Sequence, residues 1–188
     1  MEQHMISTGQ TDLYLIIFII TMLLIALATD MRAYKIPNAL TYPAAAAVLI
    51  FHTALNGMSG FLFSLLGMVA GLGIFFLPFA LGFMGAGDVK LMGVVGAALG
   101  ARGVLNACIF TSLAGGILAI ALLAIHNRNL KFIRSYADAL NASIGEQRVI
   151  NVPSTEKENK PKVYYALAIA AGTIFTICWK AAFSYYPL

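Results

Sequence analysis

The sequence predicts an all-α membrane protein, a bundle of about six transmembrane helices with its N-terminus outside. Of the 188 residues, 60% are hydrophobic and only 11% are charged, and the mean hydropathy is +0.84. A soluble domain of this size carries roughly 25% charged residues, so this chain is solvated largely by lipid. The hydrophobic residues are gathered in runs that approach the roughly 20 residues needed to cross a bilayer.

Six such runs are the predicted spans. They cover residues 13–29, 39–56, 60–83, 89–100, 104–125 and 163–182. The fourth run is short, and we expect it to be tilted, thin or partly re-entrant. Two glycine pairs, Gly67-x-x-x-Gly71 and Gly96-x-x-x-Gly100, suit close packing between helices. The segment before the first run has no Lys or Arg, so we expect that run to stay as a helix and not to be cleaved as a signal peptide.

The distribution of basic residues predicts the orientation. With the N-terminus outside, the inner segments 30–38, 84–90 and 126–162 hold ten of the twelve lysines and arginines, which favours this topology. Only Arg102 and Lys180 fall outside. Asp30 and Asp88 then both lie on the cytoplasmic side at similar depth, in a multi-pass protein of the cell (inner) membrane.

We expect a single integral membrane domain over residues 1–188, with a polar cytoplasmic loop over 127–162. That loop is too short to form a domain of its own. Between residues 130 and 140, apolar residues recur at helical spacing among basic ones. This pattern is typical of a short basic helix on the inner membrane surface, and equally of a solvated linker helix.

Two acidic residues, Asp30 and Asp88, abut predicted spans on the cytoplasmic side. A carboxylate at the centre of a span costs about 2.5–3.5 kcal/mol, and such a residue is functional by default. On its own, Gly85-Ala86-Gly87-Asp88 favours a turn followed by an N-cap for the helix at 89–100. Asp30 weakens that interpretation, because it ends a span where the helix dipole disfavours negative charge. A surface ion pair with Arg32 or Lys35 would be worth little.

The two glycines before Asp88 suit a site that admits a substrate. Glycine lets another backbone approach closely, so Gly85 and Gly87 leave Asp88 unshielded and leave a slot for an extended strand.

The motifs around these residues resemble those of prepilin peptidases. Asp30 precedes Lys35-Ile36-Pro37-Asn38-Ala39-Leu40-Thr41, and Gly85-Ala86-Gly87-Asp88-Val89-Lys90-Leu91-Met92 follows after two further spans. Prepilin peptidases belong to the G-x-G-D class of intramembrane aspartyl proteases. The short chain is similar to the compact form associated with Flp-type, tight-adherence pili.

The resemblance implies that Asp30 and Asp88 are the catalytic pair of a protease that removes the leader of type IV prepilins during pilus secretion. Two close carboxylates resist both being ionised. One then serves as base towards water, and the protonated one donates to the developing oxyanion. This chemistry requires no metal or other cofactor, and either aspartate could start protonated.

The other residues of the motifs are expected to have structural roles. Pro37 is expected to end the first helix, and Asn38 to cap the second. Ile36 belongs to the same motif. For Lys90, a positive-inside anchor is favoured over a partner for an anionic group. His52, inside the second span, is interpreted as a hydrogen-bonded packing residue.

The chain departs from the family in two places. Long-form prepilin peptidases carry an extra cytoplasmic segment with paired cysteines and also methylate the new N-terminus. Segment 30–38 contains no cysteine, so N-methyltransferase activity is not expected. Members commonly have Pro and Gly ahead of the last span's Ala168-Ile169-Ala170-Ala171-Gly172, where this chain has Tyr164 and Tyr165.

The expected partners are prepilin substrates and the lipid bilayer. The net charge of +4 is modest and does not indicate nucleic acid, and the oligomeric state is left open. The alternative functions are a small proton- or cation-coupled transporter component or a non-catalytic scaffold of a secretion apparatus. A transporter would place its acids near the bilayer midplane and show an internal repeat, and the sequence shows neither. A scaffold would tolerate Asp→Asn at both positions.

Overall fold

The computed structural model describes residues 2–33, 35–82, 84–125 and 165–183. Within these ranges the chain forms helices α1 (Glu2–Ala33), α2 (Asn38–Ala80), α3 (Ala86–Ile125) and α5 (Tyr165–Phe183), and no strand. The all-α prediction is therefore confirmed for the described residues. The loop predicted at 127–162 lies outside them.

Internal contacts divide the chain into two compact units. The first consists of Met1–Gly115 with Tyr164–Leu188, and the second is Gly116–Val163. Of the second unit the structure describes only the end of α3. The architecture below is that of the first unit, and the single domain expected over the whole chain stays a prediction.

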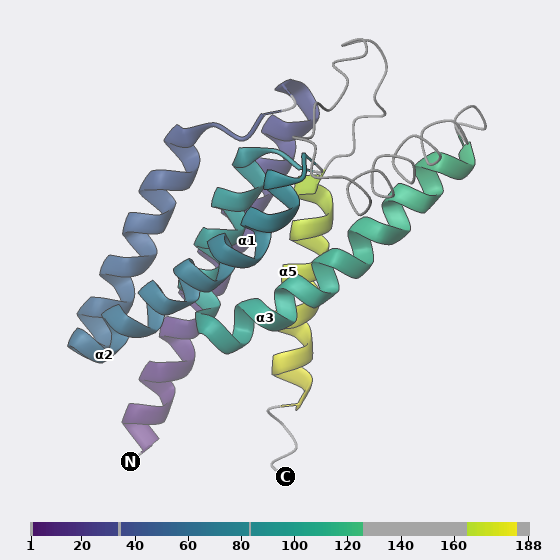
Figure 1. Cartoon of the computed structure of the whole chain (residues 1–188). Helices are drawn as coiled ribbons and strands as arrows, with labels where there is room; N and C mark the ends of the chain where they lie inside the picture. The colour runs from purple at the N-terminus through teal and green to yellow at the C-terminus, as the bar shows by residue number, and fades with distance from the viewer. Residues whose placement is uncertain (1, 34, 83, 126–164, 184–188) are drawn as a thin grey trace, which may run out of the picture. The chain divides into compact units, whose positions relative to one another are not determined.

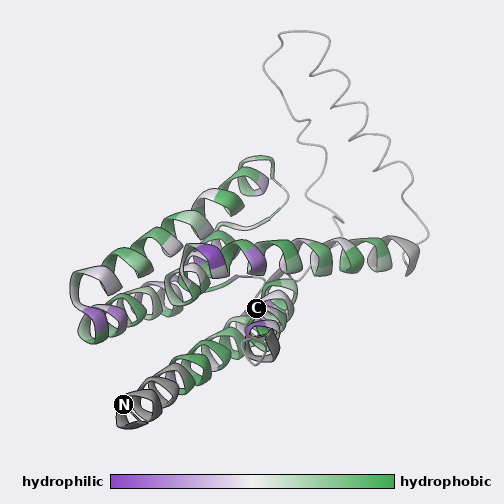
Figure 2. Ribbon diagram, turned by 90° about the horizontal axis from the view of Figure 1, so that it is seen from below, coloured by the Kyte–Doolittle hydropathy of each residue, from purple (hydrophilic) through white to green (hydrophobic). Residues whose placement is uncertain are grey.

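Three of the described helical stretches are long and apolar enough to cross a membrane. They are Leu13–Ala33, Asn38–Ala80 and Ala86–Ala121, while Tyr165–Lys180 is apolar but shorter. Figure 2 shows hydrophobic residues along each of these helices. Large apolar side chains also cover the outside, with Ile50 68% exposed and Ile109 63% exposed. Such an exterior suits lipid and would be unusual on a water-soluble monomer.

Helices α2 and α3 are each interrupted by a glycine with positive φ. Gly57 has φ 59° and ψ −138°, and Gly100 has φ 72° and ψ 176°. Residues other than glycine rarely adopt such backbone angles. At 1.5 Å per residue, 43 residues of straight α2 would measure about 65 Å, twice the roughly 30 Å of a bilayer core. The break at Gly57 lets α2 fold back on itself (Figure 1).

The interruptions coincide with the borders between predicted spans. Helix α2 contains the runs predicted at 39–56 and 60–83 (as far as Ala80), and α3 contains those at 89–100 and 104–125. The count of six spans and the outside N-terminus stay predictions that topology mapping would test.

The first leg of α3 is the centre of the core. From Val89 to Ala98 every residue is buried except half-buried Lys90, and Leu91, Met92 and Val95 are fully buried. A helix that is apolar on all sides is one enclosed by other helices. The run predicted as a short fourth span is thus part of an unbroken helical leg that starts at Ala86. Other helices surround this leg, so protein and not lipid contacts its side chains.

Glycines bring the second leg of α2 against this central leg. A Cβ placed on Gly67 would overlap the carbonyl oxygen of Gly96, and one on Gly71 would lie 2.5 Å from that of Met92. Backbone therefore packs on backbone here, and the close packing predicted for the two glycine pairs is confirmed.

Helices α1 and α5 complete the first unit. The buried residues of α1 recur every three or four positions, at Ile19, Met22, Leu23 and Ala26, which gives α1 one core-facing stripe. Helix α1 packs against α5 and α2. Helix α5 also meets α3, where the rings of Phe110 and Phe175 lie 4.4 Å apart. The last helix of the chain is thus brought beside the first (Figure 1).

Candidate active site

Asp30 lies in the last turn of α1 and is half-buried. Its carboxylate accepts a hydrogen bond from the backbone N–H of Ala166, in the first turn of α5. The first N–H groups of a helix lack partners within the helix, and the positive end of the helix dipole favours an anion. The C-terminal end of α1 disfavours a carboxylate, and the N-terminal end of α5 compensates for this.

Asp88 is the third residue of α3 and is only 8% exposed. Its Oδ2 accepts a hydrogen bond from the backbone N–H of Gly85, at 3.1 Å. An acidic residue at this position commonly reaches back to cap the residue that precedes the helix. Asp88 therefore does cap the start of a helix, as predicted. It does so from the third position of the helix and not as the N-cap, because the helix begins at Ala86 and not at residue 89.

The two carboxylates come close enough for their charges to interact, although 57 residues separate them in the chain. Asp88 lies within range of the charge of Asp30, and the phenol of Tyr165 lies within range of the charge of Asp88. The end of α1, the start of α3 and the start of α5 therefore come together at one end of the first unit.

The connection between α1 and α2 lies against the same end of α3. A Cβ on Gly87 would lie 3.0 Å from the Cβ of Ile36 and 3.4 Å from its backbone nitrogen. Ile36 is buried there, 8% exposed. The slot expected beside the glycines is thus filled at Gly87 by the chain's own Ile36, while Gly85 and Ala86 are exposed.

Pro37 and Asn38 differ from their expected roles. Helix α1 has already ended at Ala33, so Pro37 does not end it. Pro37 is instead the N-cap of α2, with extended backbone (φ −69°, ψ 139°) and no side-chain capping bond. Its carbonyl accepts a hydrogen bond from the N–H of Leu40, at 3.0 Å. Asn38 is the first residue of the helix, so the prediction that Asn38 caps it is wrong.

Lys90 has two neighbours at the start of α2. Its Nζ donates a hydrogen bond of 2.7 Å to Oδ1 of Asn38 and lies 5.0 Å from the centroid of the Tyr42 ring. Lys90 thus links α3 to α2, a contact that the anchor interpretation did not include.

Sequence reasoning missed the part that α5 plays at this end of the molecule. It singled out Tyr164 and Tyr165 as departures from the family, but no local pattern indicated that the N–H of Ala166 reaches Asp30. The interpretation of His52 is confirmed. Its Nε2 lies 3.3 Å from the carbonyl oxygen of Ala98, and its ring contacts Phe51 and Phe63.

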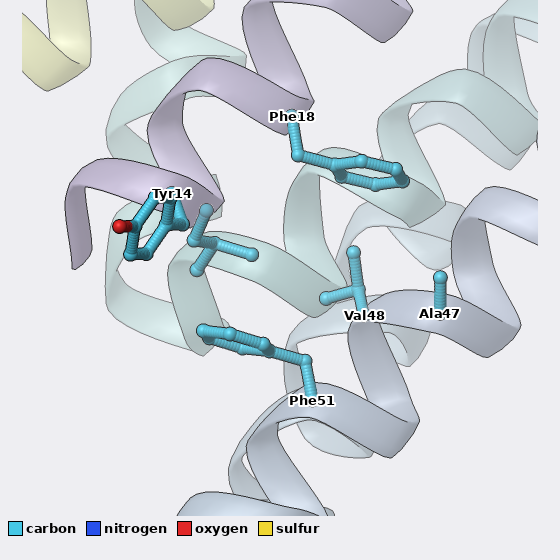
Figure 3. Close-up of a pocket in the computed structure, with 6 residues that line it drawn as sticks. Tyr14, Phe18, Ala47, Val48 and Phe51 are labelled. Atoms are coloured by element: carbon cyan, nitrogen blue, oxygen red, sulfur yellow. The ribbon is translucent and has the colours of Figure 1, made fainter. Parts of the chain in front are cut away.

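A cavity of about 230 Å³ opens elsewhere, between α1 and α2 (Figure 3). Its lining is apolar and aromatic, made by Tyr14, Leu15, Phe18, Ala47, Val48 and Phe51. Phe18 precedes Asp30 by twelve residues, about 18 Å along a helix, so this cavity is separate from the acidic pair. Among the described residues, no three His, Cys, Asp or Glu side chains are grouped as a metal site.

Comparison with known proteins identifies a family whose model matches this chain. The model of the type IV leader peptidase family matches residues 17–120, a segment that includes Asp30, the connection to α2 and Asp88. No curated protein and no solved structure shows significant similarity to the chain.

Proposed function

The chain belongs to the type IV leader peptidase family, and from this premise we propose that it is an intramembrane aspartic endopeptidase. The family implies prepilin substrates in general. The specific proposal is that the enzyme removes the leader of Flp-like type IV prepilins at the cytoplasmic face of the inner membrane, with Asp30 and Asp88 as the catalytic pair.

The observation that supports this proposal is the presence of two carboxylates within range of each other's charge at one end of the helices. Asp88 is within range of the charge of Asp30, and each carboxylate accepts a backbone N–H. Each side chain is therefore oriented by a backbone N–H while it stays within range of the other's charge. Like charges this near resist both being ionised, which favours the state with one carboxylate and one carboxylic acid.

That state is suited to hydrolysis by activated water. The carboxylate takes a proton from water as the water oxygen bonds to the scissile carbonyl carbon, and the carboxylic acid gives its proton to the carbonyl oxygen. The carbon–nitrogen bond of the resulting diol then breaks. The nitrogen takes the proton from the first carboxyl group, and one diol hydroxyl returns a proton to the second.

The exposed Gly85 and Ala86, next to Asp88, provide the approach for the scissile segment. The prepilin's own apolar helix enters sideways from the lipid, because the helices present an apolar exterior to it. Segment 30–38 contains no cysteine, and N-methylation of the new N-terminus is not part of the proposed activity.

The test is co-expression with a candidate Flp-type prepilin, with loss of the leader scored by gel shift and mass spectrometry. Asp30→Asn and Asp88→Asn are compared with Asp12→Asn, which removes a carboxylate from the first half of α1. Membrane levels of each variant are measured alongside.

We expect each of the first two substitutions to abolish cleavage in a stably inserted protein, and Asp12→Asn to retain it. The mature pilin should carry an unmethylated N-terminus. Cleavage that survives Asp30→Asn and Asp88→Asn would exclude this pair as the catalytic residues.

A further inference from the structure

Two contacts, about one turn apart on α3, attach the start of α2 to the start of α3. In the first, Ile36 packs on Gly87. In the second, Lys90 donates a hydrogen bond of 2.7 Å to Asn38, with its ammonium 5.0 Å from the Tyr42 ring centroid. Asp88 lies between the two contact points on α3.

The partners of Lys90 are chemically suited to holding an ammonium group. The amide oxygen of Asn38 accepts a charge-assisted hydrogen bond, which is shorter and stronger than a bond between neutral groups. The face of the Tyr42 ring attracts a cation through its quadrupole. Both partners are neutral, so the position of Lys90 is set by a hydrogen bond and a ring contact and not by an ion pair.

We propose that Lys90 is a positioning residue that holds the segment Ile36–Pro37–Asn38 against the first turns of α3 and so fixes the position of Asp88. The effect on catalysis rests on the proposed function, whereas the docking of the segment does not. The first contact, at Gly87, is apolar, and apolar packing does not select one orientation of the segment. The hydrogen bond from Lys90 to Asn38 is directional and fixes that orientation.

This role differs from that of a positive-inside anchor in what it requires. An anchor needs a positive charge on one side of the membrane and no particular partner. A positioning residue needs the acceptor oxygen of Asn38. Asn38→Leu therefore separates the two roles, because it removes the acceptor and leaves every charge in place.

The docking itself is measured by a disulfide reporter that does not depend on cleavage. Ile36→Cys and Gly87→Cys are introduced after Cys108 and Cys178 have been replaced by Ala. A Cβ on Gly87 lies 3.0 Å from that of Ile36, so a small adjustment reaches the spacing of about 3.5–4.5 Å that a disulfide needs. The rate of cross-linking in isolated membranes under a mild oxidant then reports how long the segment stays docked.

In this background we expect Lys90→Met and Asn38→Leu each to slow cross-linking about tenfold, the equivalent of one charge-assisted hydrogen bond. The double variant should be no slower than either single one. Asn38→Asp, which keeps an acceptor oxygen, should retain the rate. Lys35→Met, which removes an exposed charge next to the same segment, should also retain it.

Prepilin cleavage is measured separately in the protein with native Ile36 and Gly87. Lys90→Met and Asn38→Leu should lower kcat about tenfold with KM unchanged, and their effects should not add. Unchanged cross-linking in Lys90→Met would overturn the proposal, as would additive losses of the two single variants. If the unsubstituted protein cleaves no prepilin, the proposed function fails, and the cross-linking rates still decide whether Lys90 positions the segment.

Discussion

The backbone N–H of Ala166, in the first turn of α5, donates a hydrogen bond to the carboxylate of Asp30, in the last turn of α1. This bond connects two helices that are more than a hundred residues apart in sequence. It also places the N-terminal end of a helix dipole at a carboxylate that its own helix disfavours.

Ala166→Pro removes this donor without ending the helix, because proline is tolerated in the first turn. A hydrogen bond to a charged group contributes about 1.5–3 kcal/mol, so we expect cleavage to fall about tenfold to a hundredfold. The same bond also contributes to folding, so cleavage is measured per folded molecule, with the folded fraction taken from thermal denaturation in detergent. Ala166→Gly keeps the N–H and is the matched control, and equal cleavage by the two variants would contradict a role for this bond.

Gly87→Ala tests the close approach of Ile36. The added methyl group would lie 3.0 Å from the Cβ of Ile36, so the connection to α2 has to move. We expect a loss of stability of about 1–3 kcal/mol, as is typical of overpacking, and a larger relative loss of cleavage measured per folded molecule. Gly116→Ala, on the same helix with open space around the new Cβ, should leave both quantities near those of the unsubstituted protein. A Gly87→Ala protein with full cleavage would show that Ile36 can shift without consequence.

His52 is predicted to matter for stability and not for catalysis. Its Nε2 lies 3.3 Å from the carbonyl oxygen of Ala98, and its ring contacts Phe51 and Phe63. His52→Ala should lower the free energy of unfolding by about 2 kcal/mol, in the range of a lost, partly buried contact together with its hydrogen bond. Cleavage per folded molecule should be unchanged. A tenfold loss of cleavage in the fully folded variant would instead assign the histidine a part in the reaction.

Gly67→Ala is expected to disrupt the packing of α2 on the central leg of α3. The new methyl group would overlap the carbonyl oxygen of Gly96, and backbone cannot move aside as a flexible side chain can. We expect a loss of about 3 kcal/mol in unfolding free energy, measured by denaturant titration in detergent. Gly73→Ala, on the same leg with nothing within 4 Å of the new Cβ, should be neutral or slightly stabilising. Equal stability of the two variants would refute backbone contact at Gly67.

Much of the helical architecture could be predicted from the order of residues along the chain. Apolar runs indicate membrane helices because every backbone polar group in lipid must be satisfied within the element. Gly67 and Gly96 indicated close helix packing, because small residues let two backbones approach each other. The borders were less accurate. Asn38 was expected to cap α2, whereas Pro37 occupies that position, and α3 begins at Ala86 and not at residue 89. Such ends depend on one or two hydrogen bonds, which is why they shift by a few residues.

The candidate site divides in the same way. Asp30 and Asp88 stand out in the sequence because a carboxylate beside an apolar run is costly, and the motifs around them indicated the family to which the chain belongs. Three contacts depend on packing between distant segments: Ala166 with Asp30, Ile36 with Gly87, and Lys90 with Asn38. No residue pattern within one segment specifies which helix end lies opposite another. The sequence by itself therefore determined which residues place a carboxylate beside an apolar run. The tertiary structure decided which backbone groups and side chains orient these residues, because that orientation results from the docking of α2, α3 and α5.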